Sequence, residues 1–192
     1  MAQILDWSEY YRPNFFANTP DILHEYLQTG GRPAFEARLV LAATLSPSYG
    51  IYSGYESLEN APVREGSEEY LDSEKYEAKQ RKLDGPLLPL VQRLNEIRRG
   101  EPALQRVDNL RWIETEQPLI VGYVKDDLVV VVNVDPFEPH DGLAIIPAAF
   151  GLPPTFFARD LVGGERYRWT IGRNYVRLDP GQAHIFKLET HV

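Results

Sequence analysis

Two short stretches of the sequence carry side chains that could do chemistry. In the first, NFFANTPD, aromatic residues run into an Asn-Thr-Pro-Asp turn that holds the carboxylate of Asp21. In the second, SEKYE, the ammonium of Lys75 is followed directly by the phenol of Tyr76. All three groups exchange hydrogen bonds with polar ligands, and a carboxylate can also take part in acid–base chemistry. They are the candidate site residues of this chain.

Each stretch also has a plain structural explanation. Thr19, Pro20 and Asp21 would make a good helix start, with an N-cap, a proline at the first helical position and an acid near the positive end of the helix dipole. SEKYE would make a solvated charged turn, in which Lys75 contributes only to solubility and local pairing. From the local pattern alone, these structural explanations are the stronger ones.

Other reaction chemistries find no support in the sequence. The chain has no Cys, which excludes thiol catalysis and Cys-ligated zinc and agrees with a reducing compartment. The four histidines are scattered without the spacing of metal ligands, so we expect neither a metal nor another cofactor. They are His24, His140, His184 and His191.

The charge balance bears on the partners. The chain has 28 acidic and 20 basic residues, a formal net charge of -8, and no Lys/Arg block. The chain therefore lacks the basic patch that a nucleic acid would bind, and it accommodates a neutral or sugar-like ligand more easily. The start MAQILDWSEYY lacks the basic and apolar regions of a signal peptide, and no apolar run is long enough for a membrane span. These features predict a soluble, cytoplasmic protein.

Residues 1 to about 100 show a helical period. The stretch 32–47 is apolar nearly all round in its second half, which predicts a helix buried on more than one side. Residues 85–100 carry a single apolar stripe and predict an amphipathic helix. A short strand over 48–54 and a long polar connection lie between them. The order strand, helix, helix, strand, loop, helix cannot close a sheet, so this half is predicted to be the end of a larger domain.

From residue 101 onward the period changes to that of strands. The predicted strands are 110–115, 119–125, 128–134, 143–146, 155–161, 175–178 and 183–188. Asp126 and Asp127 predict a hairpin turn, and VGG at 162–164 predicts another. LVVVVNV is apolar on both faces, which is typical of a central strand. The pattern as a whole predicts a small antiparallel sandwich.

Four blocks of the sequence resemble, in the same order, the C-terminal part of the maltosyltransferases that extend α-1,4-glucans with α-maltose 1-phosphate. The blocks are YYRPNFFANTPDIL, GGRPAFEARLVLAATLSPSYGIYSGYE, GSEEYLDSEKYE and LNEIRRGEPALQ. These enzymes belong to the α-amylase superfamily, family 13 of the glycoside hydrolases. The resemblance covers nearly the whole chain. It implies an α/β fragment over residues 1–100, made of the last βα units of a (β/α)8 barrel, and an all-β antiparallel sandwich over residues 101–192.

The resemblance also implies roles for the candidate residues. Asp21 matches the third carboxylate of an amylase-type site, which holds ring hydroxyls more tightly as the sugar ring flattens in the transition state. Hydrolytic relatives carry a histidine where this chain has Pro20, which puts that imidazole contact with the sugar in doubt. Lys75 and Tyr76 match the position that holds the maltosyl donor near its non-reducing end. Full-length relatives are implied to be cytoplasmic bacterial homodimers that transfer maltosyl with retention and without a metal.

By the same resemblance, the nucleophile and the acid/base lie on earlier barrel strands, upstream of Met1. We therefore expect the isolated chain to be inactive and to work with the rest of the barrel, as part of a longer gene product or with a partner chain. The alternative is a non-catalytic glucan-binding or interaction module, for which the apolar helix over 32–45 would present an exposed patch. Trp112 and Trp169 would either stack on glucan or, as the pattern favours, pack in the core.

Overall fold

The computed structural model describes residues 6–7, 9–71, 73, 78–82 and 84–189. The helices are α2 (Glu25–Thr29), α3 (Gly31–Leu45) and α4 (Leu88–Gly100), with 3-10 helices at Tyr55–Ser57, Pro102–Gln105 and Ala148–Phe150. The strands are β1 (Asn14–Phe16), β2 (Ser48–Gly50), β3 (Leu110–Trp112), β4 (Glu114–Thr115), β5 (Ile120–Lys125), β6 (Leu128–Asn133), β7 (His140–Ile146), β8 (Thr155–Asp160), β9 (Arg166–Thr170), β10 (Gly172–Leu178) and β11 (Ala183–Glu189).

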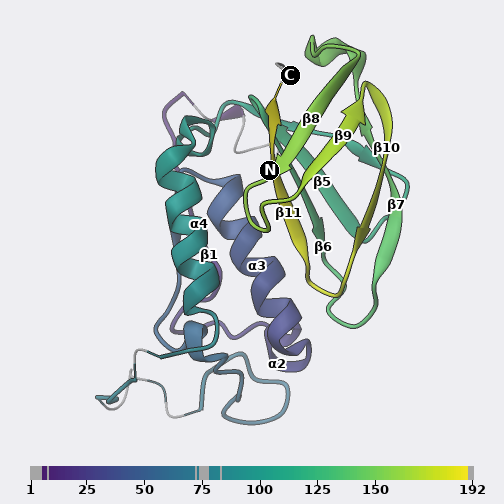
Figure 1. The fold of residues 1–192 in the computed structure, drawn as a ribbon. Coiled ribbons are helices and arrows are strands. Elements are labelled where there is room, and N and C mark those ends of the chain that lie inside the picture. The colour runs from purple at the N-terminus through teal and green to yellow at the C-terminus, as the bar shows by residue number, and fades with distance from the viewer. Residues whose placement is uncertain (1–5, 8, 72, 74–77, 83, 190–192) are drawn as a thin grey trace.

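The elements form layers. A six-stranded antiparallel sheet has the order β3-β5-β6-β11-β8-β9, and a three-stranded antiparallel sheet has the order β10-β7-β4. The helices α3 and α4 lie side by side against one face of the larger sheet, and the smaller sheet covers its other face (Figure 1). The parallel pair β1-β2 packs against α3. The C-terminal half is therefore a β-sandwich, as the strand pattern predicts.

Helix α3 is the centre of the N-terminal half. It begins near Pro33, whose fixed backbone angle suits a first turn, and it contacts β1 and β2 as well as β6 and α4. Its buried residues are Ala34, Phe35, Ala37, Leu39, Val40, Ala42, Ala43, Thr44 and Leu45. Burial on more than one side is thus confirmed. The expectation of an exposed apolar patch on this helix is wrong, because the six-stranded sheet covers it.

The strand predicted over 48–54 is shorter in the structure, since β2 ends at Gly50. From residue 101 onward the strand predictions hold with two exceptions. The hairpin between β5 and β6 turns at Asp126, which takes a left-handed φ of 52°, as two-residue hairpin loops require. β6 is buried along its whole length between β5 and β11, which confirms a central strand. The predicted strand 110–115 is divided between the two sheets as β3 and β4. The edge strand β9 is not among the predicted strands, although its arginines alternate with aromatic residues at the period of a strand.

Two buried cations hold the C-terminal end of α3, where backbone carbonyls have no partner within the helix. Arg98 of α4 donates to the carbonyls of Ala43, Ser46 and Pro47. Lys125 of β5, which is fully buried, donates from Nζ to the carbonyl of Thr44 at 3.3 Å and to that of Arg106 at 2.6 Å. Both cations also complement the negative end of the helix dipole. They join the helical layer to the sandwich.

The stability of the protein is expected to rise between pH 8 and pH 10. Burial lowers the pKa of Lys125 from 10.5 to about 8, and the neighbouring Arg98 adds to the effect. Between these pH values the unfolded chain binds more protons than the folded one, so the free energy of unfolding increases with pH, by at most about 3 kcal/mol for the full shift. Above pH 10 stability should fall, because burial raises the pKa of Tyr26 to about 12 while unfolded tyrosines ionise near 10.

Urea unfolding at a series of pH values measures this profile. The Lys125→Met variant should lose the rise between pH 8 and pH 10 and keep the decline above it. A wild-type profile that is flat below pH 10, or a variant that still shows the rise, would contradict the assignment to Lys125.

Candidate functional site

Asp21 lies in a tight turn at the carboxyl end of β1. The turn is closed by a bridge between Thr19 and Ile22, with the amide of Ile22 donating to the carbonyl of Thr19 at 3.3 Å. The Asp21 side chain is exposed. Helix α2 begins later, at Glu25, and its N-cap is His24, whose Nδ1 accepts from the Tyr26 amide at 3.1 Å. The structural alternative, in which Thr19 starts a helix, is therefore wrong, and the carboxylate lies on the surface of the described structure.

Asn18 ties this turn to two other segments. Its side chain is 2% exposed, Nδ2 donates to the phenol oxygen of Tyr70 at 2.7 Å, and Oδ1 accepts from the amide of Tyr52 at 2.7 Å. Tyr52 follows the carboxyl end of β2, and Tyr70 belongs to the long connection before α4. The buried side-chain amide of Asn18 thus joins the carboxyl ends of the two parallel strands to this connection.

Aromatic and charged groups surround Asn18. The rings of Tyr52 and Tyr70 meet edge to face, with their centroids 5.5 Å apart. The guanidinium of Arg81 lies 5.6 Å from the centre of the Tyr52 ring and pairs with Glu59. Burial raises the pKa of Tyr70, so its phenol stays protonated at neutral pH. Asn18 and Tyr70 are both buried and bonded to each other, so these contacts hold the three segments together.

The segment after Asp21 is fixed to the long connection and to α2. The amide of Leu23 donates to the carbonyl of Glu68 at 2.6 Å. Gln28 of α2 donates from Nε2 to the carbonyls of Leu23 and Ser67, each at 2.8 Å. A hollow of about 1050 Å³ opens beside these contacts. It is lined by Glu25, Gln28, Thr29, Pro62, Glu65, Gly66, Ser67 and Glu68.

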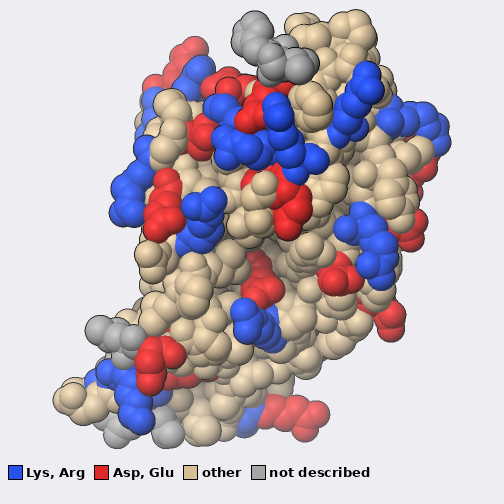
Figure 2. Space-filling model, in the orientation of Figure 1, with Lys and Arg blue, Asp and Glu red and all other residues tan. Residues whose placement is uncertain are grey.

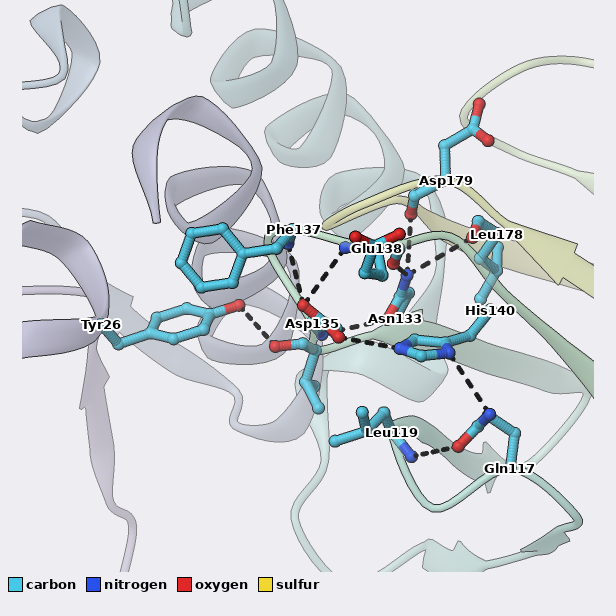
Figure 3. A network of polar contacts seen from close by, with 11 residues as sticks. Tyr26, Gln117, Leu119, Asn133, Asp135, Phe137, Glu138, His140, Leu178 and Asp179 are labelled. Atoms are coloured by element: carbon cyan, nitrogen blue, oxygen red, sulfur yellow. Dashed lines mark hydrogen bonds and ion pairs between the residues drawn. The ribbon is translucent and has the colours of Figure 1, made fainter. Parts of the chain in front are cut away.

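Helix α2 is in turn fastened to the sandwich. Figure 3 shows the Tyr26 phenol pointing at the loop after β6, where it donates to the carbonyl of Val134 at 2.9 Å. Asp135 shapes that loop by accepting from the amide of Phe137 at 2.8 Å and from Nε2 of His140 at 2.8 Å. The hydrogen bond from His140, with that from the Phe137 amide, holds the pKa of Asp135 below its ordinary value. The helix that follows the Asp21 turn is therefore joined to the sandwich by a side-chain hydrogen bond.

The predicted donor-binding residues Lys75 and Tyr76 lie outside the described residues. The neighbouring part of the connection lines a second hollow of about 520 Å³. Its walls are Ser57, Glu59, Ala78, Lys79, Gln80, Arg81, Lys82 and Asp84. Two residues near Asn18, Arg81 and Glu59, also line this hollow.

Comparison with known proteins shows what the chain is similar to. Residues 113–188 match a protein-family model described as "GLGE, C-terminal". The chain is 52% identical to α-1,4-glucan:maltose-1-phosphate maltosyltransferase 2 of Streptomyces coelicolor, over 92% of this chain and 29% of that protein. It is 44% identical to the maltosyltransferase of the same name from Mycolicibacterium smegmatis, over 97% of this chain and 29% of that protein. The chain is similar to the C-terminal part of these maltosyltransferases. The resemblance inferred from the four sequence blocks is confirmed.

The chain thus spans 29% of the length of these two maltosyltransferases. Solved structures extend the comparison at the level of the fold alone. An α-amylase from Geobacillus thermoleovorans in complex with acarbose superposes with a TM-score of 0.68 at 13% identity, over 100% of this chain and 43% of that one. An Anoxybacillus α-amylase gives a TM-score of 0.66 at 17% identity, over 95% and 39%. The chain has the fold of a portion of these α-amylases.

Several aromatic residues near the second strand also have defined places. Tyr55 is fully buried and donates to the carbonyl of Phe35 at 2.6 Å, so it belongs to the core. Tyr49 donates to Oδ1 of Asn95 on α4 at 2.7 Å. Of the three tyrosines around β2, Tyr52 alone contacts Asn18. In the sandwich, Trp169 is 5% exposed and packs in the core, whereas Trp112 is 47% exposed on an edge strand.

The described residues also bear on metal binding, membrane insertion and surface charge. Within the described ranges, no three His, Cys, Asp or Glu side chains come together in a way that could hold a metal ion. None of the described helices has the length and apolar character needed to cross a bilayer.

On the face shown in Figure 2, basic and acidic side chains are interspersed. Exposed ion pairs such as Arg32 with Glu36 at 2.6 Å contribute little to stability.

Sequence reasoning missed Asn18, Tyr70 and Arg81. Their contacts join positions that are distant in the chain, and the local pattern of a polar connection says nothing about them. The only signal was the unusual length and charge of the connection.

Proposed function

We propose that this chain forms the C-terminal part of a retaining maltosyltransferase, which transfers maltosyl from α-maltose 1-phosphate to the non-reducing ends of α-1,4-glucans in the synthesis of a glycogen-like polymer. The observation that carries the proposal is 52% identity to a named maltosyltransferase over 92% of the chain. Identity at this level, over nearly every element of the fold, supports a shared reaction as well as a shared architecture. The enzyme would work in the cytoplasm and as a homodimer.

The N-terminal half, residues 1–100, is proposed to be the end of a (β/α)8 barrel, and residues 101–192 the sandwich that follows it. Support comes from the parallel pairing of β1 with β2, with α2 and α3 after the first strand and α4 after the second. In such barrels the active site assembles at the carboxyl ends of the strands. Asn14 and Phe16 of β1 are exposed on a sheet of two strands, which suits further pairing with barrel strands from the same polypeptide or a partner chain.

Within that barrel, Asp21 would stabilise the transition state. Its position after the carboxyl end of β1 and its exposure on the rim suit a carboxylate that binds two sugar hydroxyls. Such bonds strengthen as the ring becomes oxocarbenium-like, so they lower the barrier more than they tighten substrate binding. The nucleophile and the acid/base would come from earlier barrel strands. Lys75 and Tyr76 would hold the donor near its non-reducing end.

Phosphate release tests the proposal. The full-length enzyme that contains these residues should release phosphate from α-maltose 1-phosphate when a maltooligosaccharide acceptor is present, and the acceptor should grow by maltosyl units. A polypeptide of these 192 residues alone should release none, because it supplies one of the three carboxylates. Phosphate release by the isolated polypeptide at an enzymatic rate, or none by the full-length enzyme, would overturn the proposal. The module alternative loses its support, because the helix that suggested a free docking patch is covered by the sandwich.

A further inference from the structure

A cluster of polar and aromatic side chains, separate from the surroundings of Asn18, lies in the sandwich where β8, β9 and β11 adjoin (Figure 1). Its centre is Asp160, the last residue of β8, which is 2% exposed. Four groups donate to its carboxylate: the amides of Val162 and Gly163 at 3.1 Å, the amide of Ile185 at 3.2 Å and Nδ1 of His184 at 2.8 Å. Burial raises the pKa of Asp160, but these hydrogen bonds outweigh it and hold the pKa below its ordinary value. Asp160 is therefore ionised.

The ionised carboxylate fixes the state of His184. Because Asp160 accepts from Nδ1, the neutral imidazole carries its proton on Nδ1 and a lone pair on Nε2. The ring also stacks on Phe186, with centroids 4.9 Å apart and planes 20° apart. Its side chain is 14% exposed, and the hydrogen bond to Asp160 is the one that the ring makes among the described residues. Nε2 is thus a positioned acceptor beside solvent.

An anchored aromatic face stands next to this acceptor. Tyr167 of β9 is 41% exposed, and its ring meets His184 and Phe186 edge to face, with centroids 6.1 Å and 5.7 Å away. Phe186 is itself buried and packs against Trp169 at 4.9 Å. The Tyr167 ring therefore packs against His184 and Phe186, and the rest of it is exposed to solvent. Burial and the nearby carboxylates of Glu165 and Asp160 raise the pKa of its phenol, which keeps it a hydrogen-bond donor.

The side chains of this cluster favour some classes of ligand over others. One imidazole is too few ligands for a metal ion, and the carboxylates of Asp160 and Glu165 disfavour anions. A sugar ring has an apolar face of C–H groups and a rim of hydroxyls. It therefore matches an open aromatic ring flanked by one fixed acceptor and one donor.

We propose that Tyr167 and His184 form a glucan-binding site on the sandwich. A glucose unit of an α-1,4-glucan packs on the Tyr167 ring, and one of its hydroxyls donates to Nε2 of His184. The inference rests on the proposed function, which supplies the polymer. Such a site would hold a long acceptor chain by a part of it remote from the reacting end.

Binding of the full-length enzyme to glycogen tests the site, measured by electrophoresis through gels that contain glycogen. Tyr167→Ala should weaken binding about tenfold, the loss expected for one aromatic contact, and Tyr167→Phe should keep most of it. His184→Gln should also weaken binding. The matched control is Tyr175→Ala, which removes a tyrosine that is 61% exposed on another strand and should leave binding unchanged. Thermal unfolding of each variant verifies that it is folded.

Glycogen binding by folded Tyr167→Ala at the wild-type level would overturn the site, and so would an equal loss in Tyr175→Ala. Maltosyl transfer to maltotetraose by the wild-type enzyme is measured in parallel. This acceptor is too short to need a remote site, so its turnover reports on the proposed function alone. A failure of the site leaves that turnover intact, whereas a failure of the proposed function abolishes it.

Discussion

Replacing Asp21 by Asn in the full-length enzyme is expected to lower kcat for maltosyl transfer by about 10³-fold, the scale on which removal of one preorganised transition-state contact acts. The carboxylate lies on an exposed turn at the carboxyl end of β1, and the substitution keeps its shape while removing its charge. Hydroxyl contacts that strengthen only in the transition state affect kcat more than KM. Steady-state phosphate release at varied α-maltose 1-phosphate separates the two constants.

The matched control is Asp141→Asn, which neutralises an exposed carboxylate on β7 of the sandwich. It should leave both constants unchanged. An Asp21→Asn enzyme with wild-type kcat would show that this carboxylate does not act in the transition state. A rise in KM alone would reduce its role to ground-state binding.

The Arg98→Met substitution is expected to lower the free energy of unfolding by about 3 kcal/mol, because it leaves buried acceptors without a charged donor. The guanidinium donates to three carbonyls at the end of α3, including Ser46 at 3.0 Å and Pro47 at 2.7 Å. It also stands over the Tyr49 ring, 4.8 Å from its centre. Methionine keeps most of the apolar stem, so the loss measures the hydrogen bonds. Urea unfolding gives the value.

Arg99→Met is the control, since Arg99 occupies the same last turn of α4 but is exposed. Both variants lose one positive charge near the negative end of the α4 dipole, a change worth a few tenths of a kcal/mol at an exposed site. Equal destabilisation of the two variants would mean that the contacts with α3 carry no special weight.

The sequence was most informative where one local pattern decides the structure. The helices α3 and α4 follow from a period of 3.6, and the central position of β6 follows from its unbroken apolar run. Periodicity could not reveal that 110–115 changes sheets at Ile113, because side chains alternate in the same way on either sheet. The strand β9 was also missed, although the alternation of its arginines with aromatic residues has the period of a strand.

In the candidate site, too, the sequence predicted only the part that a local motif decides. The turn of Asp21 was recognised from its motif, but its local pattern also fitted a helix start. The helix begins later because Leu23 pairs with Glu68 of the long connection, a contact that local propensity cannot express. The role of Asn18 depends on partners 34 and 52 positions away. Such convergence is a property of the tertiary fold.

The single apolar cluster that unites α3 with the six-stranded sheet has a consequence for how this polypeptide can be divided. It includes Phe35 and Leu39 from the helical side and Val130, Val132 and Ile185 from the strands. Severing the chain between α4 and β3 would expose apolar residues of this cluster on both products, whereas the second cluster, between the two sheets, would stay with the sandwich. The helical layer and the sandwich share this cluster, so we expect them to fold as one unit.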